Sequence, residues 1–230
     1  DTPMSGATLA GEVGVTGWAV DDSGIAGVDI YRLPVAGEPT NRDNGLVFIG
    51  TATQVSGARP DIVAAYPAYP GVQRAGWGYM LLSNMFPDRG NGTFSLSAFI
   101  RTTDGATAYL GSKTIVLNNA SATAPFGTID TPGQGQTVSG TITNFGWALT
   151  PQPSMIPTDG STISVYVDDL FRGHPTYNNF RSDIATVFPG YANSGGAVGF
   201  FSIDTRTLAN GVHTIAWGVV LTFACFRSGV

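Results

Sequence analysis

The feature that most limits the fold of this chain is an internal repeat. Residues 1–19 align with residues 130–148 at a constant offset of 129, and nine of the 19 positions are identical. Two further blocks, at residues 59–69 and 91–94 of the first half, recur in the second half in the same order. Repeats that keep their order indicate two copies of one fold in tandem.

A short polar segment that ends in proline separates the two copies at residues 118–125. The chain has 230 residues, which is enough for two domains that each bury a hydrophobic core. We therefore expect one domain over residues 1–119 and a second over residues 125–230.

Apolar residues within each copy recur with the two-residue period of a β-strand. On one strand of the first copy, Phe94, Leu96 and Ala98 share a side. Their counterparts in the second copy are His213, Ile215 and Trp217. About seven short strands per copy, separated by turn residues, favour a sandwich of two antiparallel sheets.

Turn and helix signals complete this pattern. An Asp-Gly pair at residues 104–105 predicts a hairpin turn into a further strand over residues 108–117. Short helical turns are expected over residues 60–68 and 182–188, where Pro60 suits the first helical position.

Three sequence patterns together resemble a known family. They are an Asp-Thr-Pro opening with a later Gly-Trp-Ala, an Arg-x-Asp-Ile segment with a later Pro-x-Tyr, and an Asn-Gly strand start near the end of each copy. The chain resembles tandem bacterial immunoglobulin-like modules of secreted and cell-surface proteins. This resemblance implies an all-β chain of two tandem immunoglobulin-like antiparallel β-sandwiches, located outside the cell or at a bacterial cell surface. It also implies a non-catalytic role as a spacer, an adhesion unit or a carbohydrate-binding accessory module.

The second copy departs from the first after Trp217. In the first copy a turn and a final strand follow Ile100, whereas an apolar run follows Trp217. We expect the second domain to lack a normal last strand, which leaves an open sheet edge. Because open edges pair with other chains, we predict self-association through this edge.

Composition excludes several functional classes. The chain has 11 basic and 16 acidic side chains, for a net charge of −5, and Lys113 is its only lysine. These residues cannot form a basic patch for nucleic acid, and no apolar run is long enough to insert into a membrane. With one cysteine (Cys225) and two histidines (His174 and His213), neither a multi-cysteine metal site nor a three-histidine zinc site is possible. We predict no metal and no other cofactor.

Arginine and aspartate stand two residues apart at the same place in both copies, as Arg59 with Asp61 and Arg181 with Asp183. One interpretation is a polar site for a hydroxyl-rich ligand. The other is a bidentate ion pair that braces the loop. Recurrence in both copies favours the brace, because a duplicated fold keeps its structural contacts.

Aromatic residues concentrate in the same middle segments, and exposed rings there are able to stack on sugars or to anchor a protein interface. Trp18 and Trp147 occupy matched positions and are predicted to be core residues. Trp77 lies opposite Gly199 in the repeat, which makes it a better ligand candidate than Trp18 or Trp147, although burial in the core is the favoured interpretation for Trp77 as well. The candidate binding residues are Arg59, Asp61, Tyr69, Trp77, Arg181, Asp183 and Tyr191.

No catalytic residue is predicted. A Gly-x-Ser-x-Gly elbow does not occur, and Cys225 is expected to be an inert thiol. His213 aligns with Phe94 on the inward side of its strand, which predicts a buried, hydrogen-bonded histidine. The alternative function is a polysaccharide-cleaving glycoside hydrolase with carboxylates in the groove between the copies. The expected partner is a polysaccharide or a surface protein.

Overall fold

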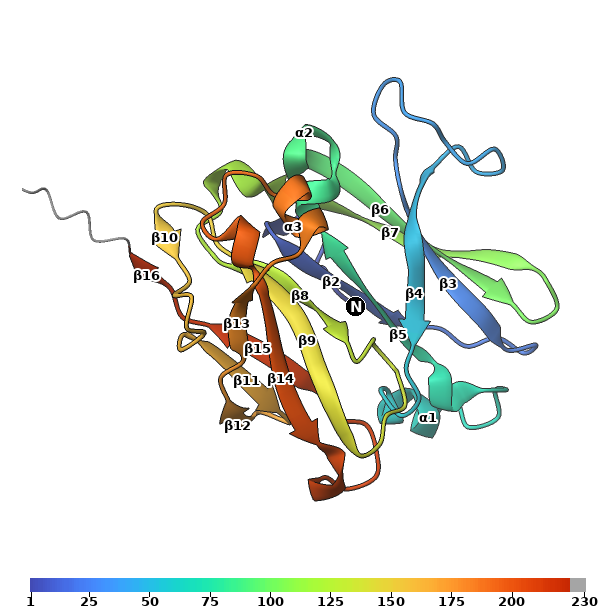
Figure 1. Cartoon of the computed structure of the whole chain (residues 1–230). Helices are drawn as coiled ribbons and strands as arrows, with labels where there is room; N and C mark the ends of the chain where they lie inside the picture. Colours follow the sequence, from blue (N-terminus) through green and yellow to red (C-terminus); the bar gives the residue numbers. More distant parts are fainter. Residues whose placement is uncertain (224–230) are drawn as a thin grey trace, which may run out of the picture. The chain divides into compact units, whose positions relative to one another are not determined.

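The computed structural model describes residues 1–223, and the chain divides into two compact units (Figure 1). Unit 1 is Asp1–Ser121 and unit 2 is Ala122–Val230, of which residues 122–223 are described. Both units consist mainly of β-strands joined by turns and short helical segments. Within the described part of the chain, no helix is long and apolar enough to cross a membrane.

Unit 1 has seven strands and several short helical segments. The strands are β1 (Thr8–Leu9), β2 (Glu12–Trp18), β3 (Ile25–Arg32), β4 (Val47–Gln54), β5 (Gly76–Leu82), β6 (Asn91–Thr102) and β7 (Thr107–Asn118). The helical segments are α1 (Pro60–Ala65), η1 (Val72–Arg74), η2 (Ser83–Met85), α2 (Pro87–Gly90) and η3 (Asn119–Ser121).

Strand β4 joins the two layers of unit 1. The strand order is β1-β7-β6-β3-β4-β5-β2. Up to Ala52, β4 pairs with β3, and at Thr53 and Gln54 it pairs with β5 instead. One layer therefore holds β1, β7, β6, β3 and most of β4, while the other holds β5 and β2. Strand β1 runs parallel to β7 and the other pairs are antiparallel. This division of the strands is that of an immunoglobulin-like sandwich.

Alternate side chains of both layers meet in the core of unit 1. On β2, Val13 and Val15 are buried, while the residues on either side of them are more exposed. From the opposite layer, Val28 and Ile30 of β3 are fully buried. Each such side chain stabilises the fold by about 1.5–3 kcal/mol through the apolar area it removes from water. The β6–β7 hairpin adds Phe94, Leu96, Ile100, Ile115 and Leu117 to this core.

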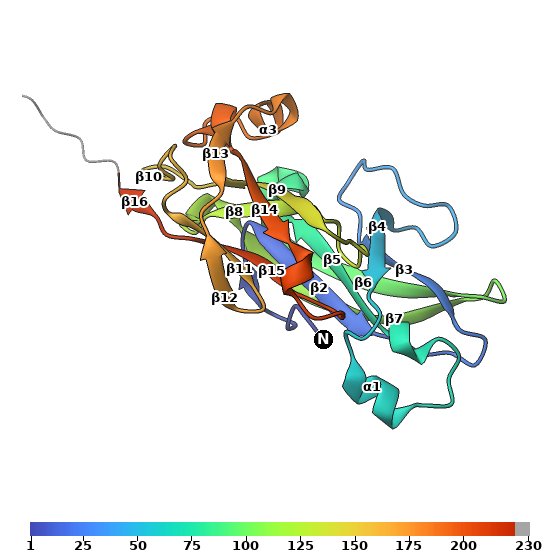
Figure 2. The same ribbon diagram turned by 60° about the horizontal axis from the view of Figure 1, so that its bottom comes forward.

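The β6–β7 hairpin is the longest strand pair of unit 1 and is plainly visible in Figure 2. Its register runs from Asn91 opposite Asn118 to Arg101 opposite Thr107, which confirms the predicted hairpin. The turn contains Gly105 at a φ of 90°, the left-handed conformation that an Asp-Gly turn requires.

Residues 122–223 of unit 2 form nine strands in three sheets. The strands are β8 (Phe126–Thr131), β9 (Thr141–Leu149), β10 (Ser154–Met155), β11 (Ile163–Val167), β12 (Leu170–Gly173), β13 (Thr176–Asn179), β14 (Val198–Asp204), β15 (Ile215–Val219) and β16 (Thr222–Phe223). The helical segments are α3 (Ser182–Val187), η4 (Ser194–Gly196) and η5 (Thr205–Thr207). One sheet has the order β13-β14-β9-β8, a second has the order β12-β11-β15, and β10 pairs with β16. Ala148, Ile156, Ile163 and Tyr177 form a core cluster of this unit.

Two pairs of matching elements begin and end at equivalent residues of the two units. Strand β14 lies 122 residues after β5, and α3 lies at the same offset from α1, which confirms both predicted helical turns. Strand β15 is the counterpart of β6, and among the described residues it pairs only with β11. The remainder of the predicted apolar end, with Cys225, lies outside the described residues.

The large ring of each core comes from a different strand in the two units. In unit 1, Trp77 of β5 is 8% exposed and its indole covers Gly17. In unit 2 the position of Trp77 is taken by Gly199, and Trp217 of β15 packs over that glycine. The counterpart of Trp217 in unit 1 is Ala98. The large residue therefore lies on β5 in unit 1, but on β15, the counterpart of β6, in unit 2. Trp77 therefore fills the core, in agreement with the favoured interpretation, and is not exposed for ligand binding.

Close packing at Gly17 leads to a stability prediction. A Cβ added there would lie 2.4 Å from Cζ2 of Trp77, so we expect Gly17→Ala to lower the free energy of unfolding by about 1–3 kcal/mol. Gly14 is the matched control on the same strand, because a Cβ there meets nothing within 4 Å. Urea unfolding of the two variants measures the difference, and equal stability of both would contradict this packing.

Candidate functional site

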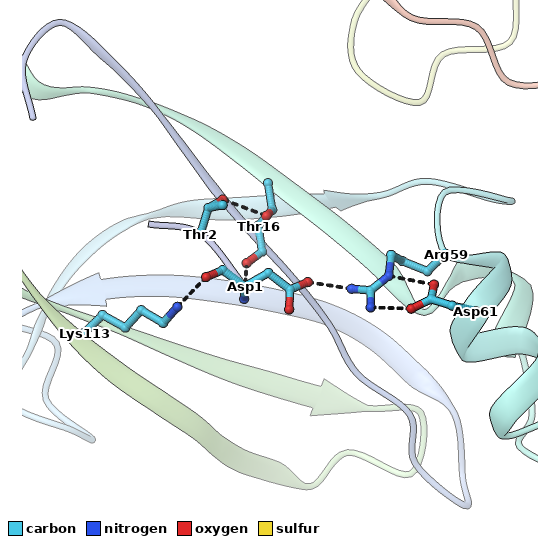
Figure 3. Close-up of polar contacts among 6 residues, drawn as sticks. All are labelled: Asp1, Thr2, Thr16, Arg59, Asp61 and Lys113. Atoms are coloured by element: carbon cyan, nitrogen blue, oxygen red, sulfur yellow. Dashed lines mark hydrogen bonds and ion pairs between the residues drawn. The ribbon is translucent and has the colours of Figure 1, made fainter. Parts of the chain in front are cut away.

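The predicted arginine–aspartate pair of unit 1 is an ion pair with a third member (Figure 3). Arg59 lies directly before α1, and its Nε and Nη2 donate to the two carboxylate oxygens of Asp61 at 2.9 and 2.7 Å. Its Nη1 donates to the carboxylate of Asp1 at 2.5 Å. All three guanidinium nitrogens are thus engaged, and the side chain ties α1 to the segment that leads into β2.

Unit 2 repeats this contact residue for residue. Arg181 donates from Nε and Nη2 to Asp183 at 2.7 and 2.9 Å, and its Nη1 donates to Asp130. Asp130 is the counterpart of Asp1 at the offset of 129. This third member was not predicted from the sequence, although the Asp-Thr-Pro opening that recurs in both copies contains it. Recurrence of the complete contact supports the interpretation of both pairs as structural braces.

Hydrogen bonds to arginine keep the brace carboxylates ionised. The bond from Arg59 lowers the pKa of Asp61 to about 2, and Arg181 lowers the pKa of Asp183 in the same way. The pKa of Arg181 is raised, chiefly by its bond to Asp183. These carboxylates are poor proton donors at neutral pH.

Acid is expected to weaken the braces. The folded-state pKa of Asp61 lies below its unfolded value, so its contribution to stability is complete above about pH 4 and is lost as the pH falls toward 2. We expect Arg59→Met to remove part of the loss of stability over that interval, measured by urea unfolding at several pH values. Arg42→Met, in the exposed β3–β4 loop, is the control. An unchanged pH dependence in Arg59→Met would contradict the brace.

Aromatic rings pack around the helical turn in each unit. In unit 1, Tyr66 stacks on Trp18 with ring centroids 5.6 Å apart, and Tyr69 meets Tyr66 edge-on at 5.9 Å. Trp18 and Tyr69 pack against a second small buried cluster that contains Ile62, so Trp18 is half-buried outside the main core, contrary to its predicted core position.

In unit 2, another aromatic ring packs over the counterparts of these rings. Phe126 of β8 packs against Trp147 at 5.8 Å and against Tyr191 at 5.2 Å, and Phe188 takes the place of Tyr66. Trp147 is buried as predicted. Tyr69 and Tyr191 are thus half-buried parts of aromatic clusters that support the helical turns.

A row of four aromatic side chains crosses the outer face of unit 1. Phe48, Tyr31, Phe99 and Tyr109 lie on the neighbouring strands β4, β3, β6 and β7, and we call them the aromatic row. Successive ring centroids are 5.3, 5.5 and 5.1 Å apart. Tyr31 and Phe99 are half-buried, while Phe48 and Tyr109 at the two ends are 51% and 56% exposed. Exposed rings gathered in this way mark interaction surfaces.

A polar trio adjoins the aromatic row. Asp29, which is only 8% exposed, accepts hydrogen bonds from Oγ1 of Thr51 at 2.6 Å and from Nε of Arg101 at 2.8 Å. Arg101 lies across Gly27, where a Cβ would come within 2.5 Å of its Nη2. Its guanidinium is about half exposed, and Nη1 takes part in neither bond to Asp29. The trio therefore offers an ordered, partly accessible donor beside the rings.

The pKa values of Tyr31 and Arg101 are shifted by burial and by Asp29. The pKa of Tyr31 is raised, first by burial and then by the negative charge of Asp29. The bond to Asp29 also raises the pKa of Arg101. Tyr31 is therefore a neutral hydroxyl and Arg101 a permanent cation, which suits recognition of uncharged polar groups.

The side chain of His213 is more exposed than predicted. It is hydrogen-bonded as expected, but it is half-exposed because β15 begins only at Ile215. Its Nδ1 donates to Asp168 at 2.6 Å and its Nε2 donates to the carbonyl oxygen of Ala209 at 2.7 Å. Both partners are acceptors, so both ring nitrogens must carry hydrogen, and the bond to Asp168 raises the pKa of His213.

The pH dependence of this contact follows from both partners. The pKa of His213 is raised, so its contribution to stability is present below about pH 6.5 and is lost as the pH rises through the folded-state pKa. The pKa of Asp168 is lowered, so its contribution is present above about pH 4 and is lost in acid. We expect Asp168→Asn to bring the pKa of His213, measured by NMR titration, down toward its ordinary value. Asp169→Asn is the control, and a wild-type pKa at or below about 6.5 would contradict the contact.

Among residues 1–223, no three His, Cys, Asp or Glu side chains gather where they could hold a metal ion.

Comparisons with known proteins give structural neighbours of low sequence identity and no family for this chain. No protein-family model and no curated protein matches it. It is similar to fibronectin(III)-like modules of Clostridium thermocellum CbhA, with 13% identity, coverage of 94% of this chain and 82% of that one, and a TM-score of 0.33. It is also similar to chicken TCR, with 8% identity, coverage of 89% and 90%, and a TM-score of 0.29. The immunoglobulin-like assignment rests on the strand order and register within the units.

Proposed function

We propose that this chain is a non-catalytic accessory module of a secreted or surface protein, and that it binds polysaccharide. The contact surface in this proposal is the aromatic row of unit 1 together with the polar trio. The observation that carries the proposal is the placement of four rings on four neighbouring strands, with both end rings about half exposed.

The chemistry of this face matches a sugar chain. The C–H groups of a sugar ring carry partial positive charge and are attracted to the negative face of an aromatic ring. Hydroxyl groups at the ring edge need donors and acceptors, which Arg101, Asp29 and Thr51 supply from one ordered cluster. An apolar protein partner would remove Nη1 of Arg101, which takes part in neither bond to Asp29, from water without supplying an acceptor, at a cost in free energy.

The charges of the carboxylates support a non-catalytic role. A hydrolase needs a carboxylic acid that holds its proton near neutral pH, which requires a raised pKa. Asp61 and Glu38 each accept hydrogen bonds from an arginine, and these bonds lower the pKa of each carboxyl to about 2. The two side chains therefore serve as ion-pair partners.

Binding to insoluble cellulose, xylan and chitin tests the proposal. We expect retention on at least one of them, and we expect the double change Phe48→Ala with Tyr109→Ala to weaken it about tenfold or more. That loss corresponds to about 1.4 kcal/mol. Phe180→Ala is the matched control, because Phe180 is 70% exposed in unit 2 and lies outside the row. Thermal unfolding checks that each variant is folded.

Three results would contradict this function. Retention that is unchanged in the double variant would show that the row is not the contact surface. Release of soluble reducing ends by the purified wild-type protein would show that the chain is a hydrolase. If the protein binds none of the three polymers and a surface protein captures it instead, the partner would be a protein and not a polysaccharide.

A further inference from the structure

The connection between β3 and β4 is a long loop that adjoins the aromatic row. It spans residues 33–46 (Figure 1), so it begins two residues after Tyr31 and ends two residues before Phe48. These two rings lie opposite each other in the strand register. The corresponding connection in unit 2, between β11 and β12, has only two residues. Long loops without strands or helices are uncommon in compact domains, and those that are ordered usually serve a function.

A buried ion pair holds the first half of this loop. Arg32, the last residue of β3, is 6% exposed and donates from Nη1 and Nη2 to the two carboxylate oxygens of Glu38 at 2.6 and 2.5 Å. Glu38 also accepts a hydrogen bond from the backbone N–H of Val35 at 2.8 Å. Because both groups of this bidentate pair are charged, the pair fixes the path of the loop beside the row.

Hydrogen bonds orient the side chain of Asn44 in the second half of the loop. Its Oδ1 accepts from the backbone N–H of Leu46 at 3.0 Å. The pKa of Tyr31 is raised, first by burial, while a hydrogen bond with the side chain of Asn44 acts in the opposite direction. That effect requires a donor to the phenolic oxygen, because such a donor favours the charged form. The amide Nδ2 of Asn44 therefore donates to Oη of Tyr31.

This arrangement leaves the hydrogen of the Tyr31 hydroxyl for another acceptor. A tyrosine hydroxyl both accepts and donates, and the bond from Asn44 uses only the oxygen. The half-buried ring of Tyr31 packs edge-on against Phe48 and Phe99, which fixes where the hydroxyl lies. The row therefore contains a donor of defined position among rings that are otherwise apolar.

We propose that the hydroxyl of Tyr31 donates a hydrogen bond to the bound polysaccharide and determines which polymer is preferred, with Asn44 as its positioning residue. This proposal rests on the polysaccharide function proposed above. Stacking alone distinguishes poorly between polymers, because every sugar ring offers C–H groups to an aromatic face. A positioned donor distinguishes them by whether an acceptor lies at the right place on the edge of the sugar ring.

Titration calorimetry with soluble oligosaccharides of cellulose, xylan and chitin tests the role of Tyr31. We expect Tyr31→Phe to lower the affinity for the preferred oligosaccharide about threefold to tenfold, as the loss of one neutral hydrogen bond does. The preference over the other two should fall by a similar factor. Tyr166→Phe is the matched control, because Tyr166 and Phe171 form the equivalent cross-strand pair of unit 2, where the loop is absent.

Asn44→Asp tests the positioning role. The carboxylate still accepts from Leu46 but has no hydrogen to donate, so the Tyr31 hydroxyl donates to it instead. We expect a similar loss of affinity, no further loss in the double variant with Tyr31→Phe, and a higher pKa of Tyr31 in an NMR titration. Asn41→Asp is the control, because it adds the same charge to the same loop at a side chain that accepts from the backbone N–H of Asp43.

The possible failures are distinguishable. Equal affinity of Tyr31→Phe and the wild-type protein would overturn the role of Tyr31 and leave the polysaccharide function intact. Additive losses in the double variant, or a pKa of Tyr31 that Asn44→Asp does not change, would overturn the role of Asn44. If the wild-type protein binds none of the oligosaccharides, the polysaccharide function itself is wrong, and the assignment of Tyr31 is wrong with it.

Discussion

The burial of alternate apolar side chains between two layers is the constraint on which the rest of this structure depends. Because a strand points successive side chains to opposite faces, fixing Val28 and Ile30 in the core places Asp29 and Tyr31 on the outer face of β3. The same rule, applied to four neighbouring strands, brings the aromatic row together. The candidate binding surface is thus the outer side of the sheet whose inner side forms the core of unit 1.

Comparison of the two units separates structural residues from candidate functional ones. The contacts of Arg59 and Arg181 are alike down to the aspartate that opens each unit, and they hold the helical turn in both. The aromatic row, in contrast, includes Phe99, whose counterpart in unit 2 is Gly218. The cross-strand pair of Tyr31 and Phe48 has an equivalent in Tyr166 and Phe171 of unit 2, so it is the complete row, and not each of its rings, that distinguishes unit 1.

Sequence patterns were sufficient for the architecture because they report local and repeated constraints. The alternation around Phe94, the Asp-Gly hairpin and the helical turn at Pro60 all appear as predicted. The burial of Trp77 was favoured from the sequence, but its contact with Gly17, a residue 60 positions away that accepts the indole, was not predicted. The aromatic row was likewise not predicted, since Tyr31, Phe48, Phe99 and Tyr109 become neighbours only through strand pairing. In the sequence these aromatic residues are recognisable because they occupy strand positions that alternate with the core positions.

The most direct test of the binding surface is an NMR titration of the isotope-labelled protein with soluble oligosaccharides of cellulose, xylan and chitin. The account predicts that backbone and side-chain resonances of the aromatic row and of Arg101 shift together with one affinity. Shifts confined to the surroundings of Arg59 and Tyr66, or shifts that leave the row unchanged during saturable binding, would contradict it.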